Sequence, residues 1–368
     1  MGPMKILAAS DFHLGMKFRH YPEVSDRLIA ARFTALEKLV EAGNREGCDL
    51  FILAGDLFDT TSVPKATVLK ARAILDRFAG KLVAVLPGNH DFYVPQGKDL
   101  WETFIGEGRG NVLVLTEGAP VPLAADWQLD ACLYPAPCFA KHSQANGLAW
   151  MAAAPRPACA IHIGVAHGSV EGISPDMDGR YYPMTRGEID RLGMDAMFIG
   201  HTHAQRVEGT LFIPGTPEPD GFDCAHDGAG LLVELQRGKA PRATPVPSGT
   251  YTWRHETHLL SEASAVDRLQ EKLSQPAYHT RLLKLRLEGR LAADAFQKTR
   301  EWGAVLREKC FHLASFENQI GLLIGKADID ARYAPGSFAH ELLTELARAP
   351  EDVPALQKAW DHLGGGRP

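Results

Sequence analysis

The sequence lacks any apolar run long enough to cross a membrane. A transmembrane helix needs about 18 or more consecutive apolar residues, and every apolar run in this chain is shorter than that. The N-terminus also lacks the basic and apolar regions of a secretory signal peptide. From these absences we expect a cytoplasmic protein that does not associate with membranes.

Cysteine is sparse, and positive charge is not in excess. The 6 cysteines among 368 residues include no Cys-x-x-Cys pair, so we expect scattered reduced thiols instead of a disulfide framework. The net charge of -6 provides no overall basic field to attract nucleic acid. Bound divalent cations would add local positive charge, so a DNA substrate is disfavoured by composition without being excluded.

The remaining composition is that of a globular protein, with 45% hydrophobic and 23% charged residues. This length allows one large catalytic domain and a smaller one. Short apolar segments at 4–9, 50–54 and 82–86 alternate with helical apolar spacing at 27–42 and 64–78. Strands that alternate with helices predict an α/β core with parallel strands.

Five short polar motifs follow apolar segments, each at the point where a strand is expected to end. They are Asp-Phe-His at 11–13, Gly-Asp-Leu-Phe-Asp at 55–59, Gly-Asn-His-Asp at 88–91, Gly-Val-Ala-His at 164–167 and Gly-His-Thr-His at 200–203. Open α/β sheets bind their ligands at the carboxyl ends of the strands. No motif is decisive alone, although Gly-Asn-His-Asp is more specific than the others, but all five in this order predict a single site.

The residue types in these motifs point to a transition metal. Asp11 and His13 are two positions apart, as are His201 and His203, so at a strand end both members of each pair point the same way. Carboxylate beside imidazole suits Mn, Fe or Zn better than Ca. The Asp56 carboxylate is suited to bridge two metal ions, which lie about 3.5–4 Å apart in such sites. The pattern predicts a two-metal site that hydrolyses a phosphate ester.

At these motifs the chain resembles the calcineurin-like metallophosphoesterases, over about residues 4–235. The resemblance implies an α/β fold, a four-layer β-sandwich flanked by helices, with two divalent metal ions. The family's pattern places one ion among Asp11, His13, Asp56 and His203. It places the other among Asp56, Asn89, His167 and His201.

The resemblance also implies roles in catalysis. A water or hydroxide between the metals would attack phosphorus, and His90 would protonate the leaving oxygen or stabilise the charged transition state. The carboxylate of Asp59 would orient His90 and raise its pKa. A plain turn residue is an equally reasonable interpretation of Asp59.

Three motifs, at 11–15, 55–59 and 87–91, resemble the DNA-repair nuclease branch of the family, which includes the bacterial SbcD-type subunits. This implies a DNA exonuclease of 3′-to-5′ polarity, with endonuclease activity left open. Mn would be the preferred metal, with Fe, Zn and Co as alternatives. An SMC-like coiled-coil ATPase and a second copy of the chain are the partners that the resemblance implies.

The prolines at 240–248 predict a linker that divides the chain. We expect a catalytic domain at 4–240, a small α/β capping domain at 249–333 and a C-terminal helical segment at 334–368. The capping domain would help to hold DNA over the metals. The helical segment would contact the ATPase or pack on its own domain.

Two other functions stay open. One is a small-molecule phosphodiesterase or phosphatase acting on cyclic nucleotides or nucleotides, with its pocket closed by residues 170–185. The other is an interaction subunit with a vestigial site, which the intact ligand set argues against. A nuclease would instead line a groove with Lys17, Arg19, Phe92, Tyr93 and Arg180.

Overall fold

The computed structural model describes residues 2–95, 100–106, 110–176, 179–300, 302–348 and 353–365. The chain divides into two compact units, Met1–Trp253 and Arg254–Pro368. The first unit contains all five motifs. The assignment of separate capping and C-terminal domains stays a prediction.

The first unit contains two six-stranded sheets. The first sheet has the order β12 (Arg242–Pro247), β11 (Ala229–Leu235), β1 (Met4–Ala9), β2 (Leu50–Ala54), β3 (Leu82–Leu86) and β4 (Val112–Val114). The strands from β1 to β4 are parallel to one another. At the other edge, β11 pairs antiparallel with β1, and β12 pairs antiparallel with β11.

The second sheet has the order β5 (Val121–Pro122), β6 (Ala131–Ala136), β7 (Ile161–His167), β8 (Ala196–Gly200), β10 (Leu211–Ile213) and β9 (Arg206–Glu208). Strands β6, β7, β8 and β10 are parallel, and the short strands β5 and β9 pair antiparallel at the edges. A short helix, α4 (Ala124–Trp127), lies between β5 and β6 in sequence.

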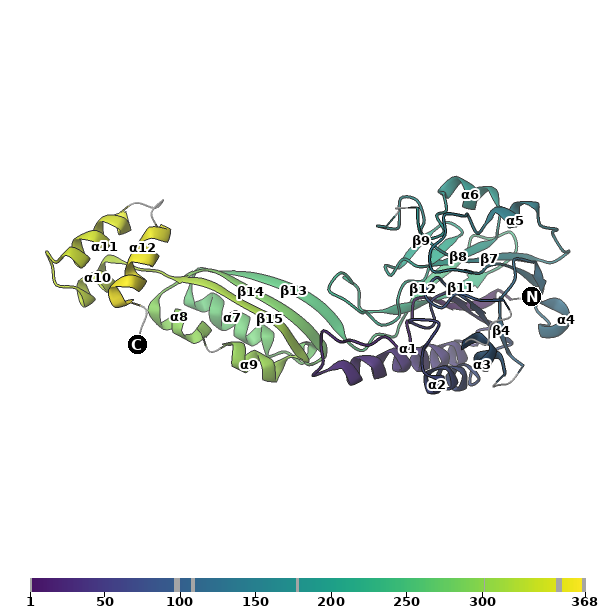
Figure 1. The fold of residues 1–368 in the computed structure, drawn as a ribbon, viewed down its shortest axis with the longest axis horizontal. Helices are drawn as coiled ribbons and strands as arrows, with labels where there is room; N and C mark the ends of the chain where they lie inside the picture. The colour runs from purple at the N-terminus through teal and green to yellow at the C-terminus, as the bar shows by residue number, and fades with distance from the viewer. Residues whose placement is uncertain are drawn as a thin grey trace. The chain divides into compact units, whose positions relative to one another are not determined.

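The two sheets pack face to face through a shared apolar core. Ile52 and Ala84 of the first sheet belong to the same buried cluster as Ile163 and Phe198 of the second. The outer face of the first sheet is covered by α1 (Ser25–Glu46), α2 (Lys65–Leu75) and α3 (Leu100–Gly106) (Figure 1). Helices α5 (Ala149–Ala153) and α6 (Arg186–Arg191) cover the outer face of the second sheet. These layers confirm the predicted four-layer sandwich flanked by helices.

The predicted linker at 240–248 is wrong. Residues Arg242–Pro247 form β12, which pairs antiparallel with β11 at the edge of the first sheet. An edge strand tolerates proline because its outward-facing N–H groups are not needed by a neighbouring strand. Pro245 and Pro247 both lie within this strand, so these prolines mark a sheet edge.

The second unit is built on a three-stranded sheet in the order β13 (Thr252–Leu260), β14 (Arg281–Leu291) and β15 (His312–Leu322). Strands β14 and β15 are parallel. Helices α7 (Ala263–Leu273), α8 (Ala293–Arg300) and α9 (Trp302–Lys309) lie on one face of this sheet (Figure 1), and the 3-10 helix η1 (Pro276–Thr280) precedes β14. This unit therefore has its own α/β core.

The end of the described chain is helical. Helices α10 (Lys326–Arg332), α11 (Phe338–Arg348) and α12 (Val353–Trp360) share an apolar cluster that includes Ile329, Leu343 and Trp360, and a π-helical turn, η3 (Asp361–Gly365), follows. Across the residues that the structure describes, no helix combines the length and apolar character needed to cross a membrane.

Candidate metal centre

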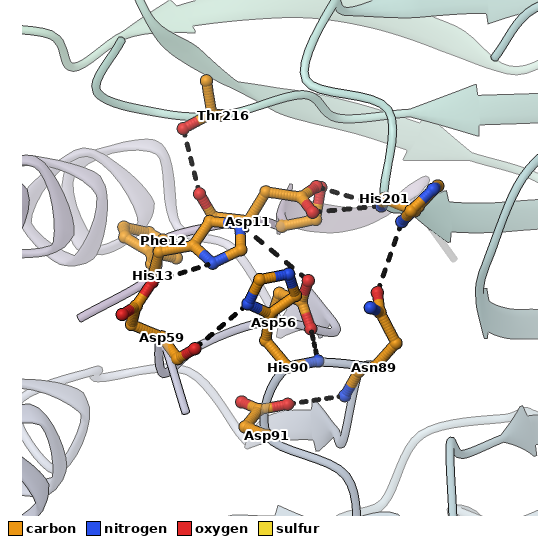
Figure 2. Close-up of polar contacts among 12 residues, drawn as sticks. Asp11, Phe12, His13, Asp56, Asp59, Asn89, His90, Asp91, His201 and Thr216 are labelled. Carbon is orange, nitrogen blue, oxygen red and sulfur yellow. Dashed lines mark hydrogen bonds and ion pairs between the residues drawn. The ribbon is translucent and has the colours of Figure 1, made fainter. Parts of the chain in front are cut away.

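The five motifs converge where strands of both sheets end. Asp11 lies just beyond β1, Asp56 just beyond β2 and Asn89 just beyond β3. The second sheet contributes His167, the last residue of β7, and His201, which directly follows β8. Residues from segments almost two hundred positions apart therefore face one another (Figure 2). The expectation that the motifs form a single site is confirmed.

The backbone of these loops is strained at four of the residues whose polar side chains form the cluster. Asp11, His13, Asp56 and His201 have positive φ angles of 57°, 43°, 52° and 98°, which non-glycine residues adopt only when the surroundings enforce it. The surroundings here are hydrogen bonds between the loops. The amide of Asp11 donates to the carbonyl of Gly55 at 3.1 Å, and that of His13 donates to the carbonyl of Asp56 at 3.0 Å. The amide of His201 donates to the Asp11 carboxylate at 3.1 Å.

Two motif glycines are required by close packing around the side chains. A Cβ atom at Gly55, where φ is 93°, would lie 2.1 Å from Nδ1 of His167. A Cβ atom at Gly88 would lie 2.2 Å from a carboxylate oxygen of Asp56. Any larger residue at either position would displace a side chain of the site.

All seven predicted metal ligands lie in this cluster. Potential ligand atoms of Asp11, His13 and His203 lie within 4.8 Å of one another, as do those of Asp11, Asp56 and His167. Nε2 of His167 lies 3.2 Å from Asp56 Oδ2 and 2.9 Å from Asn89 Oδ1. Nδ1 of His201 lies 3.3 Å from the same Asn89 oxygen. The division of these residues between two ions stays a prediction.

His13 shows that the cluster fits a metal ion. The residue is 3% exposed, and both of its ring nitrogens are buried without a hydrogen-bond partner. Such unpaired buried polar atoms cost free energy unless something binds them. Burial lowers the pKa of His13 to about 4, so the ring is neutral at physiological pH, which is the form that binds metal.

His167 and Asp56 form a buried charge pair. Burial acts against both charges, but the Asp56 carboxylate raises the pKa of His167 to about 9, and His167 holds the pKa of Asp56 below its usual range. Nδ1 of His167 is occupied by the carbonyl of Ala54 at 2.9 Å. Nε2 is thereby directed at Asp56, where a bound cation would take the place of its proton.

His90 adjoins this cluster, with a ring nitrogen within 4.8 Å of ligand atoms of His13 and Asp56, and Asp59 contacts both His13 and His90. The amide of His90 donates to Asp56 Oδ1 at 2.8 Å, and Nδ1 of its ring lies 3.0 Å from the backbone carbonyl oxygen of Asp59 (Figure 2). The Asp59 carboxylate lies 3.8 Å from Nδ1 of His13 and is close enough to His90 to interact with it electrostatically. The hydrogen bond that holds His90 therefore comes from the main chain of Asp59. The expectation was either that the Asp59 carboxylate orients His90 or that Asp59 is a plain turn residue.

Asp91, the last residue of its motif, is a structural residue. It is fully buried and accepts hydrogen bonds from the amides of Phe58 at 2.9 Å and Gly88 at 2.7 Å. Burial, reinforced by the nearby Asp56 charge, raises the pKa of Asp91 to about 8. Its side chain joins the loop after β2 to the loop after β3, and so keeps Asp56 beside Asn89.

Three charged residues that the sequence did not single out contact the histidines or support them. Asp176 accepts from Nε2 of His201 at 2.8 Å. Asp220 lies 3.5 Å from Nδ1 of His203 and pairs with Arg32 at 3.0 Å. A sequence signal existed for Arg32, a charged residue inside the apolar stripe of the first helix. Asp176 and Asp220 lie in loops without any motif.

A cavity of about 870 Å³ opens over the cluster. Its walls include His13, Asp56, His90, His201 and His203. The remaining walls are Ile173, Pro175, Asp176, Thr202, Ala204, Gln205, Arg206, Asp223, Cys224, Ala225 and His226. Lys17, Arg19, Phe92, Tyr93 and Arg180, expected to line a nucleic-acid groove, are not among these lining residues.

Comparisons with known proteins agree with this chemistry. Residues 4–205, more than half of the chain, match the family model of the calcineurin-like phosphoesterases. An uncharacterized metallophosphoesterase of Bacillus subtilis, YhaO, is 24% identical over 314 residues, which cover 82% of this chain and 69% of YhaO. One component of the nuclease SbcCD of Escherichia coli, SbcD, is 37% identical over 94 residues, which cover 24% of this chain and 21% of SbcD.

Two solved structures are also similar to this chain. TT1561 of Thermus thermophilus is 14% identical, with a TM-score of 0.40 over 66% of this chain and 99% of that chain. The calcineurin-like phosphoesterase YfkN of Bacillus subtilis is 11% identical, with a TM-score of 0.39 over 67% of this chain and 91% of that chain. On the family match and the metal-ligand cluster together, the chain belongs to the calcineurin-like phosphoesterase family and is a metallophosphoesterase.

Proposed function

We propose that this metallophosphoesterase cleaves the phosphodiester bonds of DNA, as an exonuclease of 3′-to-5′ polarity. The observation that carries the choice of substrate is the stretch of 94 residues that is 37% identical to SbcD, a protein named as part of a nuclease. That stretch covers 21% of SbcD, so polarity, endonuclease activity and a role in DNA repair all belong to the proposal.

The proposed site holds two divalent cations, with Mn preferred and Fe, Zn or Co as alternatives. One would be held by Asp11, His13, Asp56 and His203, and the other by Asp56, Asn89, His167 and His201. When bound, such ions polarise the phosphoryl oxygen and lower the pKa of bound water. Neutral imidazole and carboxylate oxygen together suit these transition metals.

The proposed general acid is His90. A carbonyl oxygen can only accept a hydrogen bond, so the contact of Nδ1 with the carbonyl of Asp59 at 3.0 Å places a hydrogen on that nitrogen. When the ring is doubly protonated, Nε2 carries the second proton and would give it to the leaving oxygen or stabilise the charge there. His90 forms part of the cavity wall, where a scissile phosphate would lie.

The proposed partners are DNA, an SMC-like coiled-coil ATPase and a second copy of the chain. Support for an ATPase contact comes from the second unit, where Phe338 at the start of α11 is 77% exposed. Exposed aromatic side chains are favoured at protein interfaces. The Escherichia coli relative is itself named as one part of a nuclease.

A second candidate function is a small-molecule phosphodiesterase acting on cyclic nucleotides or nucleotides. The observation in its favour is the cavity wall. Ile173, Pro175 and Asp176 belong to the segment expected to close a small pocket, and all three line the cavity. The side chains expected along a DNA groove are absent from the same wall.

One experiment separates the two candidates. End-labelled single- and double-stranded linear DNA, bis-p-nitrophenyl phosphate and a panel of cyclic nucleotides are incubated with the parent protein and His90→Ala in a Mn²⁺ buffer. The proposal predicts that the parent shortens DNA from its 3′ ends and that the variant does not. Intact DNA together with rapid turnover of a cyclic nucleotide would contradict it and support the small-molecule enzyme.

A further inference from the structure

Arg32, on helix α1, is almost completely buried, although it carries a permanent charge. It is 1% exposed. One guanidinium nitrogen donates to the backbone carbonyl of Phe12 at 2.6 Å, and the other pairs with Asp220 Oδ2 at 3.0 Å. A buried charge is tolerated only when it is paired and hydrogen-bonded, so these contacts account for its position.

The second oxygen of Asp220 faces the metal cluster. Oδ1 of Asp220 lies 3.5 Å from Nδ1 of His203 and 3.3 Å from the sulfur of Cys224, which donates to it. The carboxylate is 10% exposed. One carboxylate therefore contacts the buried guanidinium on one side and a predicted metal ligand on the other.

We propose that Asp220, anchored by Arg32, is a positioning residue that sets His203 for metal binding. This inference rests on the two-metal site proposed above and is independent of the substrate. The Asp220 contact at Nδ1 leaves Nε2 of His203 as the nitrogen for the ion. A carboxylate on the far nitrogen of a histidine fixes its tautomer and ring orientation and makes it a stronger ligand.

Arg32 extends this positioning to the first motif. Phe12, whose carbonyl accepts from Arg32, lies between Asp11 and His13 in the sequence. The carbonyl of Asp11 itself accepts from the hydroxyl of Thr216 at 2.9 Å (Figure 2). The loop of the first motif and the segment around residues 216–220 are thus joined by two buried polar contacts, which keep His203 near Asp11 and His13.

The test measures Mn²⁺ binding without substrate, by titration calorimetry on the full chain. We expect Asp220→Asn to bind one of two Mn²⁺ ions about 10- to 100-fold more weakly, the range typical of lost carboxylate support, while two ions still bind. The electron paramagnetic resonance spectrum of the weakened ion should change as well. Equal Mn²⁺ affinity in parent and variant would overturn the inference.

The control for breaking a buried arginine–aspartate pair is Arg72→Met, which breaks a similar pair away from the metal cluster. Arg72 is also a buried helical arginine, 3% exposed, which pairs with Asp76 at 2.9 Å and donates to the carbonyl of Phe104 at 2.8 Å. It lies on α2 and is not among the residues of the metal-ligand groups. We expect this variant to be less stable than the parent but to bind Mn²⁺ with unchanged affinity, which separates general destabilisation from lost positioning.

The single variant leaves Arg32 without its ionic partner and could unfold the chain. The double variant Arg32→Met/Asp220→Asn removes both charges, a change that buried ion pairs often tolerate. Its Mn²⁺ affinity should stay as weak as that of Asp220→Asn. Recovery of parental affinity would overturn the inference, because the unpaired arginine would then explain the loss.

Cys224→Ser tests whether this cluster is itself a metal site. Ligand atoms of His203, Asp220 and Cys224 lie within 4.8 Å of one another. We expect the serine variant, which keeps a donor beside Asp220, to bind two ions with parental affinity. Loss of one ion in both Cys224→Ser and Asp220→Asn would make these residues direct ligands and overturn the positioning role. A parent that binds two ions and leaves DNA intact would refute only the proposed function.

Discussion

Nδ1 of His90 lies 3.0 Å from the backbone carbonyl oxygen of Asp59, whereas the Asp59 carboxylate lies 3.8 Å from Nδ1 of His13. The side chain of Asp59 was expected to orient His90, the proposed general acid, but the hydrogen bond to His90 comes from the main chain of Asp59. A backbone contact survives substitution of the side chain. The two residues named as catalytic from the sequence are therefore expected to respond very differently to mutation.

Replacing His90 should impair chemistry and leave metal binding intact. We expect His90→Asn to lower kcat for bis-p-nitrophenyl phosphate by about 10²- to 10⁴-fold, the usual contribution of a positioned acid. Mn²⁺ affinity should not change, because His90 is not one of the proposed ligands. Steady-state kinetics and calorimetry measure the two quantities, with His20→Ala, an exposed loop histidine, as the control. A loss of bound Mn²⁺ would instead make His90 a ligand.

Replacing Asp59 should have a much smaller effect on the same reaction. In Asp59→Ala the carbonyl that accepts from His90 is still present, so we expect kcat to fall by less than about 10-fold, below the contribution of a general acid. The loss should be compared with that of His90→Asn in one assay. If both variants lost the same activity, the carboxylate and not the carbonyl would be orienting His90.

The fold and the convergence of the five motifs could be predicted because their signals are local. Glycine is required at position 55 because φ is positive there and a Cβ atom would collide with His167. Glycine is required at position 88 because a Cβ atom would collide with Asp56. Such constraints leave a readable motif within a few residues of each ligand. The alternation of apolar strands and helices likewise predicted the α/β core with parallel strands, whereas the four-layer arrangement was implied by the resemblance to the family.

The parts that could not be predicted depend on contacts between distant residues. Asp220 contacts Arg32, which is 188 positions away in the chain (220 − 32), and no spacing rule relates the two. The prolines around Pro245 by themselves indicate a linker. Their place in an edge strand depends on pairing with β11, which is a property of the folded sheet and leaves no signal in the local sequence. The cavity wall was ambiguous for the same reason, since Ile173 and Arg206 meet there only after folding.

His13 allows metal binding to be separated from folding. Its two ring nitrogens are buried without a hydrogen-bond partner, so replacing the ring with an apolar side chain removes a desolvation penalty. We expect His13→Leu without metal to unfold at the same temperature as the parent or higher. The stabilisation by Mn²⁺ should be lost, whereas in the parent it should reach about 2.7 kcal/mol per site at a concentration 100 times Kd.

Thermal unfolding with and without Mn²⁺ measures both effects of His13→Leu. Ca²⁺ serves as the control ion, because it prefers oxygen ligands and should stabilise the parent little. A metal-free variant that unfolds far below the parent would show that the ring has a structural role here. Equal Mn²⁺ stabilisation of both proteins would remove His13 from the ligand set.

Glu256, on β13 in the second unit, is expected to make stability depend on pH. Its carboxylate accepts from His258, Lys272, Tyr278 and Arg281 at 2.8–3.0 Å. Burial acts to raise its pKa, but these hydrogen bonds prevail and lower the pKa from 4.5 to about 2. A lowered carboxylate pKa stabilises the folded state above the unfolded pKa, and the stability is lost as pH falls from 4.5 towards 2.

We expect Glu256→Gln to destabilise the second unit by about 2 kcal/mol at pH 7, since one unit of pKa shift corresponds to about 1.4 kcal/mol and part of it is screened. The difference from the parent should shrink at pH 3, because the Glu256 carboxyl of the unfolded parent, with its ordinary pKa of 4.5, is protonated there while that of the folded parent is still ionised. Hydrogen exchange of β14 in the full chain, corrected for intrinsic rates, measures this at both pH values. Glu262→Gln is the control, because that carboxylate is 63% exposed and pairs with Arg268 on the surface. A difference that stays constant with pH would mean that Glu256 acts through packing, not through its charge.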